Sequence, residues 1–193
     1  HAINKTISAI MKELFNDEIG DIVTSKIHFG LKSVGGFNDE VAVVYAIVMT
    51  LAASKKSEIE FEKLIIDVIN NANESGINSI DNYFINQNID LKEIKLKLDY
   101  ENSRKISYIH RIFNQLFYGP VLYEEIFNEK SQFSEKPLID LDNIVLDDNL
   151  MSKLKTRFGN KISTVTGRGN FAFSYSMKNY LDNFDMKNSV FLE

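Results

Sequence analysis

Hydrophobic and polar positions follow a helical period over most of this 193-residue chain. Apolar residues that recur every three or four positions share one face of a helix, and this spacing predicts helices over residues 3–15, 61–69, 80–84 and 106–117. Gly119-Pro120 interrupts the last of these, so we expect a further helix over residues 121–127. Ser57-Glu58-Ile59-Glu60 has the pattern of a capping box, which predicts the start of the second helix.

The segment from Val41 to Leu51 differs because it is apolar on nearly every side. Asn38 is a candidate N-cap before it, and Lys55 and Lys56 suit the negative end of a helix dipole behind it. A helix that is apolar all round is a buried helix, so this one is predicted to be the central element. The apolar run from Val41 to Ala53, about 13 residues long, is too short to cross a bilayer. The N-terminus also lacks a signal-peptide pattern, and we therefore expect a cytoplasmic protein without a membrane partner.

Four segments have features of strands instead. Residues 21–31 are rich in β-branched side chains, and residues 94–100 alternate apolar and polar positions with a period of two. Residues 161–166 and 171–177 fit two short strands joined by the turn Gly167-Arg168-Gly169-Asn170. The expected fold class is therefore α+β and predominantly α-helical.

The predicted domain organisation has three parts. We expect a helical domain over residues 1–130, an acidic linker over 131–148, and a basic helix–hairpin module over 149–193. At this length the three parts are alternatively one domain. The module begins with a helix near residues 150–158 that is closed by Gly159.

Composition excludes several kinds of chemistry. The chain has no cysteine and three histidines, which removes disulfide scaffolds, thiol nucleophiles and cysteine-based metal sites. No Walker loop or Gly-x-Ser-x-Gly elbow is present. We therefore expect no cofactor and no metal, and we favour a binding protein over an enzyme.

Charge is distributed unevenly along the chain. The net charge is −5, yet residues 150–181 contain six basic side chains and no acidic one, so the remainder carries −11. A segment free of carboxylates in an acidic protein is a candidate anion-binding surface, and nucleic acid is a common large anion. A helix followed by a hairpin resembles the end of a winged-helix domain, in which a helix enters the major groove and the hairpin contacts phosphate. The resemblance implies DNA or RNA contact by Lys153, Lys155, Arg157, Lys161, Arg168 and Asn170.

The acidic residues that precede this module suggest a protein partner instead. They could pair with the basic segment, or the acidic surface could bind a basic protein as an inhibitor or subunit would. The acidic residues concerned are Glu135, Asp140, Asp142, Asp147 and Asp148.

Two short motifs point to nucleases. Arg104 and His110 are spaced similarly to the motif of HEPN-type ribonucleases, and that resemblance implies that Arg104 steadies a phosphate while His110 assists proton transfer, across a homodimer. Glu93 and Lys95 with Asp81 upstream are similar to the PD-(D/E)xK nucleases, in which carboxylates bind Mg²⁺. The favoured expectation is a non-catalytic accessory or regulatory protein of a bacterial or phage system that binds nucleic acid. A HEPN-like ribonuclease and an acidic protein-interaction subunit are its alternatives.

Overall fold

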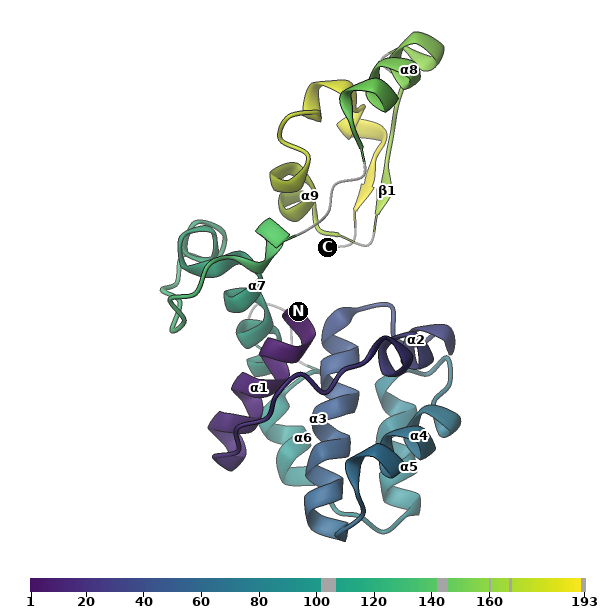
Figure 1. The fold of residues 1–193 in the computed structure, drawn as a ribbon, viewed down its shortest axis with the longest axis vertical. Helices are drawn as coiled ribbons and strands as arrows, with labels where there is room; N and C mark the ends of the chain where they lie inside the picture. Colours follow the sequence, from purple (N-terminus) through teal and green to yellow (C-terminus); the bar gives the residue numbers. More distant parts are fainter. Residues whose placement is uncertain (102–106, 142–145, 160, 167, 192–193) are drawn as a thin grey trace. The chain divides into compact units, whose positions relative to one another are not determined.

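The fold is predominantly helical, as the sequence predicts. A computed structural model describes residues 1–101, 107–141, 146–159, 161–166 and 168–191 (Figure 1). Within these ranges the chain forms nine α-helices, three short 3₁₀ helices and one two-stranded parallel sheet. The chain divides into two compact units, His1–Lys136 and Pro137–Glu193. Among the described helices, none combines the length and the apolar character that crossing a bilayer requires.

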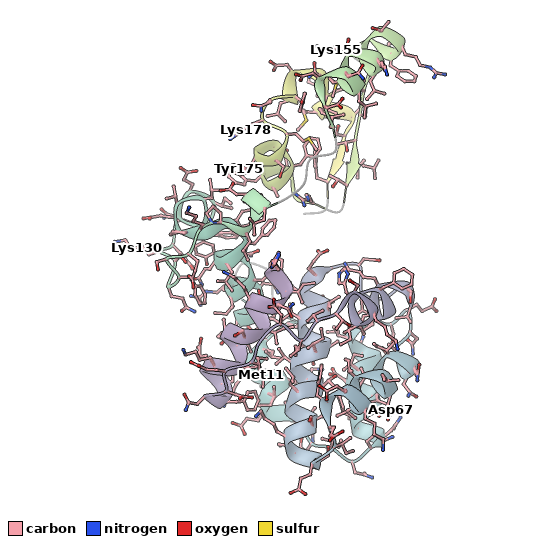
Figure 2. The ribbon with its side chains drawn as sticks, in the orientation of Figure 1. Met11, Asp67, Lys130, Lys155, Tyr175 and Lys178 are labelled. Carbon is pink, nitrogen blue, oxygen red and sulfur yellow. The ribbon has the colours of Figure 1, made fainter. Side chains whose placement is uncertain are left out.

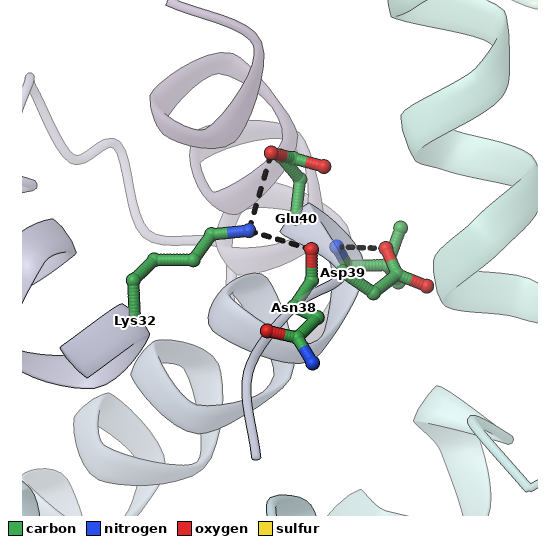
Figure 3. Close-up of polar contacts among 5 residues, drawn as sticks. Lys32, Asn38, Asp39 and Glu40 are labelled. Carbon is green, nitrogen blue, oxygen red and sulfur yellow. Dashed lines mark hydrogen bonds and ion pairs between the residues drawn. The ribbon is translucent and has the colours of Figure 1, made fainter. Parts of the chain in front are cut away.

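Helix α3 (Glu40–Ser57) is the centre of the first unit, and its central position confirms the prediction (Figure 1). All side chains from Val41 to Ala53 are buried. The helix starts one residue later than expected, because the Asp39 carboxylate rather than Asn38 accepts a hydrogen bond from the Val41 amide at 2.8 Å. Lys32 Nζ braces the same turn by donating to the Asn38 carbonyl at 2.8 Å (Figure 3).

The predicted helices around α3 are present. They are α1 (Ala2–Phe15), α4 (Phe61–Asn71), α5 (Ile77–Asn86) and α7 (Tyr108–Phe127). Helices α1, α4, α5 and α7 all pack on α3, and α1 also packs on α7. The backbone of α7 leaves helical geometry at Gly119 (φ 68°, ψ 174°), which confirms the predicted break before Pro120.

Gly36 and Gly76 bring two loops of the first unit into direct contact. A Cβ atom on Gly36 would clash with the backbone of Gly76 and with the carbonyl of Asn73. Gly76 has φ 61° and directly precedes α5, a conformation that favours glycine. The absence of side chains at Gly36 and Gly76 therefore allows the loop before α3 and the loop before α5 to approach each other closely.

Two predicted strands of the first unit are helices. Residues 25–33 form α2 (Ser25–Ser33), because the Thr24 hydroxyl caps it by accepting from the Ile27 amide. Residues 92–98 form α6 (Lys92–Leu98), in which Ile94 and Leu98 are buried one turn apart and Leu96 is 78% exposed. A strand would have placed all three on one face, so the period of two in the sequence was misleading.

The predicted capping box is also wrong. Ser57 is the last residue of α3, and its hydroxyl donates to the Ala53 carbonyl at 2.8 Å. Glu60 is the N-cap of α4 and makes no side-chain capping bond. The long apolar helix continues through the serine, so its side chain is not available to the next helix.

The second unit is built of short elements. In chain order they are η1 (Leu138–Leu141), α8 (Asp148–Phe158), β1 (Val165–Thr166), α9 (Asn170–Ser176), η2 (Leu181–Asn183), η3 (Met186–Asn188) and β2 (Val190–Phe191). Strands β1 and β2 are parallel, with Val165 opposite Val190. The ring of Phe173 lies with its centroid 5.4 Å from those of Phe184 and Phe191. These ring contacts pack α9 against Phe184 and Phe191.

The predicted β-hairpin does not form, because residues 170–176 are helix α9 and β1 pairs with β2. A strand would have buried Phe171 and Phe173 on one face, whereas Phe171 is 40% exposed and the adjacent Ala172 is buried. Neighbouring buried residues of this kind fit a helix. The winged-helix arrangement is therefore not confirmed, although its first helix, α8, is present.

Candidate nucleic-acid interface

Helix α8 carries half of the predicted contact residues and is well defined at both ends. The Asp147 carboxylate accepts a hydrogen bond from the Leu150 amide at 2.7 Å, which caps the start. Gly159, with φ 60°, ends the helix by donating its amide to the Lys155 carbonyl at 2.8 Å. Acidic residues at the first turn and basic residues at the last turn both suit the helix dipole.

The basic residues of α8 point in two directions. Lys153, Lys155 and Arg157 are all exposed, and Figure 2 labels Lys155 on this helix. Lys153 and Arg157 are four residues apart and therefore share a face. Lys155 is two residues from each of them, which places it about 160° around the helix. A single flat surface can engage Lys153 and Arg157 together, but not Lys155 as well.

An exposed aromatic ring accompanies these cations. The guanidinium carbon of Arg157 lies 5.3 Å from the centroid of the Phe158 ring, which is a cation–π contact. Phe158 is 49% exposed and Leu150 on the same apolar side is 43% exposed, whereas Met151 is buried. One side of α8 therefore offers both charge and apolar surface to a partner.

The other three predicted residues are placed differently from what a hairpin would require. Lys161 is exposed just after α8. Arg168 is half-buried and donates from a guanidinium nitrogen to the Ser176 hydroxyl at 3.1 Å, so it is directed at α9. Asn170 is the first residue of α9, and its side-chain carbonyl accepts from the Ser174 hydroxyl at 3.3 Å. Arg168 and Asn170 thus stabilise their own segment.

The acidic residues before α8 and at its first position accept hydrogen bonds from hydroxyl and amide groups. Tyr175 donates to Asp140 at 2.8 Å, and Tyr180 donates to Asp148 at 3.1 Å. These hydrogen bonds to a carboxylate raise the pKa of both tyrosines. No local pattern in the sequence indicates these two contacts, because the tyrosines stand 35 and 32 residues from their partners. Among the described residues, Asp140, Asp147 and Asp148 make no ion pair with the basic segment.

Lys178 contributes a second cation–aromatic contact in this unit. Its Nζ lies 5.3 Å from the ring centroid of Tyr175, and Figure 2 labels both residues. Within Pro137–Glu193 the sequence has seven basic and seven acidic side chains. The unit is neutral as a whole but its charges are separated along the chain.

His110, predicted for a ribonuclease site, lies in the first turn of α7 and its side chain is only 6% exposed. Its Nδ1 lies 3.1 Å from the Ser107 hydroxyl and its Nε2 lies 3.9 Å from an Asp39 oxygen. Arg104 is outside the described residues. The pairing of Arg104 with His110 stays a prediction. Because the His110 side chain is buried, little of its ring is accessible to a phosphate in solution.

The residues predicted for a metal-dependent nuclease separate into two groups. Lys95 Nζ donates to Asp81 at 2.7 Å, whereas Glu93 pairs with Lys97 at 2.9 Å on the exposed side of α6. The second donor to Asp81 is the hydroxyl of Tyr45, which donates to the other carboxylate oxygen at 2.7 Å. Within the described part of the chain, no three carboxylate or histidine side chains gather as metal ligands would.

No protein-family model matches this sequence, and neither curated protein sequences nor solved structures give a match.

Proposed function

We propose that the second unit binds nucleic acid through the exposed cations Lys153, Arg157 and Lys161, as a non-catalytic accessory function in a bacterial or phage cytoplasm. The observation that carries this proposal is that the acidic neighbours of α8 are engaged by hydroxyl and amide groups. The cations of α8 therefore remain available for phosphates.

Phe158 adds a sequence-independent contact to this surface. Exposed rings next to arginine stack on bases in single-stranded nucleic acid, and each such contact is worth about 1 to 3 kcal/mol. The exposed ring of Phe158 beside Arg157 fits that role. We therefore expect single strands to bind more tightly than duplex DNA.

The number of cations sets the salt dependence. Three phosphate contacts give a slope of about −3 in log K against log salt, and affinity then falls about 40-fold between about 50 and 200 mM salt. The sequence alone suggested six contact residues. Arg168 is directed at Ser176 and Lys155 faces away from Lys153, which lowers the number.

Fluorescence anisotropy with labelled single-stranded DNA, RNA and duplex DNA tests the proposal. The double variant Lys153→Ala/Arg157→Ala should weaken binding at least about tenfold at about 50 mM salt and reduce the slope to about −1. The matched control is Lys26→Ala/Lys63→Ala, which removes two exposed cations of the first unit and should change affinity less than about twofold.

Equal losses in the two double variants would show only a general charge effect and would contradict the assigned surface. Absence of binding by the unmodified protein at low salt would reject nucleic acid as the partner. A stable complex with a basic protein would then favour the acidic interaction subunit.

A further inference from the structure

A cavity of about 480 Å³ lies in the first unit beside α3, α5 and α6, and none of the residues proposed for the nucleic-acid surface lines it. Met49, Phe84 and Leu91 line it and are themselves almost fully buried. Ile85 lines it as well and is 65% exposed, so it lies where the cavity meets solvent. This volume falls within the range of small-molecule sites, which are mainly apolar with a few polar groups.

Asp81 and Lys95 supply polar groups to the lining, and the structure fixes both. The Asp81 side chain is 11% exposed and accepts from Tyr45 at 2.7 Å and from Lys95 at 2.7 Å. Lys95 also pairs with Glu101 at 2.8 Å. The hydrogen bonds to Asp81 and Glu101 raise the pKa of Lys95, so it stays an ammonium at neutral pH.

The hydrogen-bonding capacity of this pair is not used up. A carboxylate accepts about four hydrogen bonds and an ammonium donates three. Among the described residues Asp81 accepts two, and Lys95 donates to two carboxylates. One donor and further acceptor positions therefore remain on a lining that also includes the apolar side chains of Met49, Phe84 and Leu91.

Charges among the lining residues cancel. Asp81 and Asp90 are balanced by Lys92 and Lys95, so the lining residues carry no net charge. A hydroxyl group is both a donor and an acceptor, and it can donate to Asp81 while it accepts from Lys95. A charged head group could satisfy only one of the two.

We propose that this cavity binds a small, uncharged, apolar molecule that carries a hydroxyl group, with the hydroxyl hydrogen-bonded to both Asp81 and Lys95 and the apolar body against Met49, Phe84 and Leu91. The site is independent of the nucleic-acid surface, and either proposal can fail alone.

Titration of the ¹⁵N-labelled full chain with hexan-1-ol, hexylamine and hexanoate tests this proposal by NMR. Hexan-1-ol should cause saturable shifts at the amides of Phe84, Ile85 and Leu91, and the two charged analogues should bind at least about fivefold more weakly. Asp81→Asn should weaken hexan-1-ol binding about fivefold, because one hydrogen bond to a charged group is weakened.

Steric variants separate this site from general surface binding. Ile85→Trp should fill the entrance and weaken binding at least about tenfold, whereas Ile66→Trp, a partly exposed position on α4 outside the cavity, should change it less than about twofold. Absence of saturable shifts, or equal effects of the two tryptophan variants, would overturn the site. Equal or tighter binding of a charged analogue, or unchanged binding to Asp81→Asn, would overturn the hydroxyl assignment.

Discussion

The two units of this protein achieve order in different ways. Of the apolar side chains that are buried among the described residues, 29 belong to His1–Lys136 and five to Pro137–Glu193. The first unit surrounds one apolar helix with others, and burial supplies most of its stability. The second unit depends on a few ring contacts and on side-chain hydrogen bonds to carboxylates.

The second unit also leaves several apolar side chains exposed. In the second unit they include adjacent strand positions, Val165 at 83% and Val190 at 58%, as well as Phe158 on α8. Small units bury a lower fraction of their surface and have less stability to lose. A substitution that removes packing in one unit should therefore destabilise that unit and leave the unfolding of the other unchanged.

The largest effect should come from Gly36→Ala in the first unit. The new Cβ would clash with the backbone of Gly76, which cannot rotate away, so we expect a loss of about 4 kcal/mol in the free energy of unfolding. Urea unfolding followed by circular dichroism measures it. Gly20→Ala is the matched control, because no atom lies within 4 Å of its Cβ position. Similar stability of both variants would contradict the close contact of the two loops.

Phe173→Ala should have the next largest effect and should be confined to the second unit. Removal of the ring that contacts Phe184 and Phe191 should cost about 3 kcal/mol, because a cavity replaces a buried side chain. Hydrogen exchange should show faster exchange in α9 and unchanged protection in α3. Phe158→Ala removes a half-exposed ring and should cost less than about 1 kcal/mol. Loss of protection in both units would mean that they unfold together.

Tyr45→Phe should cost about 1.5 kcal/mol at neutral pH, because it removes a hydrogen bond to the Asp81 carboxylate. Burial and that bond raise the pKa of Tyr45 above its ordinary 10.0. The fold therefore favours the neutral phenol, and this contribution is present below pH 10 and is lost as the pH rises above it. Urea unfolding at several pH values should show a shallower decline above pH 10 in the variant. Parallel declines would contradict this assignment.

Asp147→Ala should have the smallest effect of the four, about 1 kcal/mol, because it removes the N-cap of α8. Thermal unfolding of the second unit measures it. Asp182→Ala removes an exposed carboxylate from the same unit and should have little effect. If the two variants behave alike, the cap does not stabilise α8. The cap variant should also weaken nucleic-acid binding, since α8 positions Lys153 and Arg157.

Local sequence patterns predicted the long elements well and the short ones poorly. Helices α1, α4, α5 and α7 were predicted because each has several apolar residues at helical spacing. Residues 94–98 and 171–175 span so few positions that a period of two and a helical face share the same apolar residues. In both places the structure is a helix. Lys153 and Arg157 could be assigned to one face from their spacing alone, whereas the engagement of Arg168 by Ser176 could not.

The sequence by itself determined that α3 is central, because an all-apolar helix has no stable position except the interior. It also determined the break at Gly119-Pro120 and the separation of charge in the second unit, which are properties of residue order. Only the tertiary structure decided that Asp81 meets Tyr45 and Lys95, or that β1 pairs with β2 rather than with residues 171–177. Those contacts join residues 14 to 36 positions apart in the first unit and 25 apart in the sheet. Their formation depends on how whole helices pack, which local periodicity does not encode.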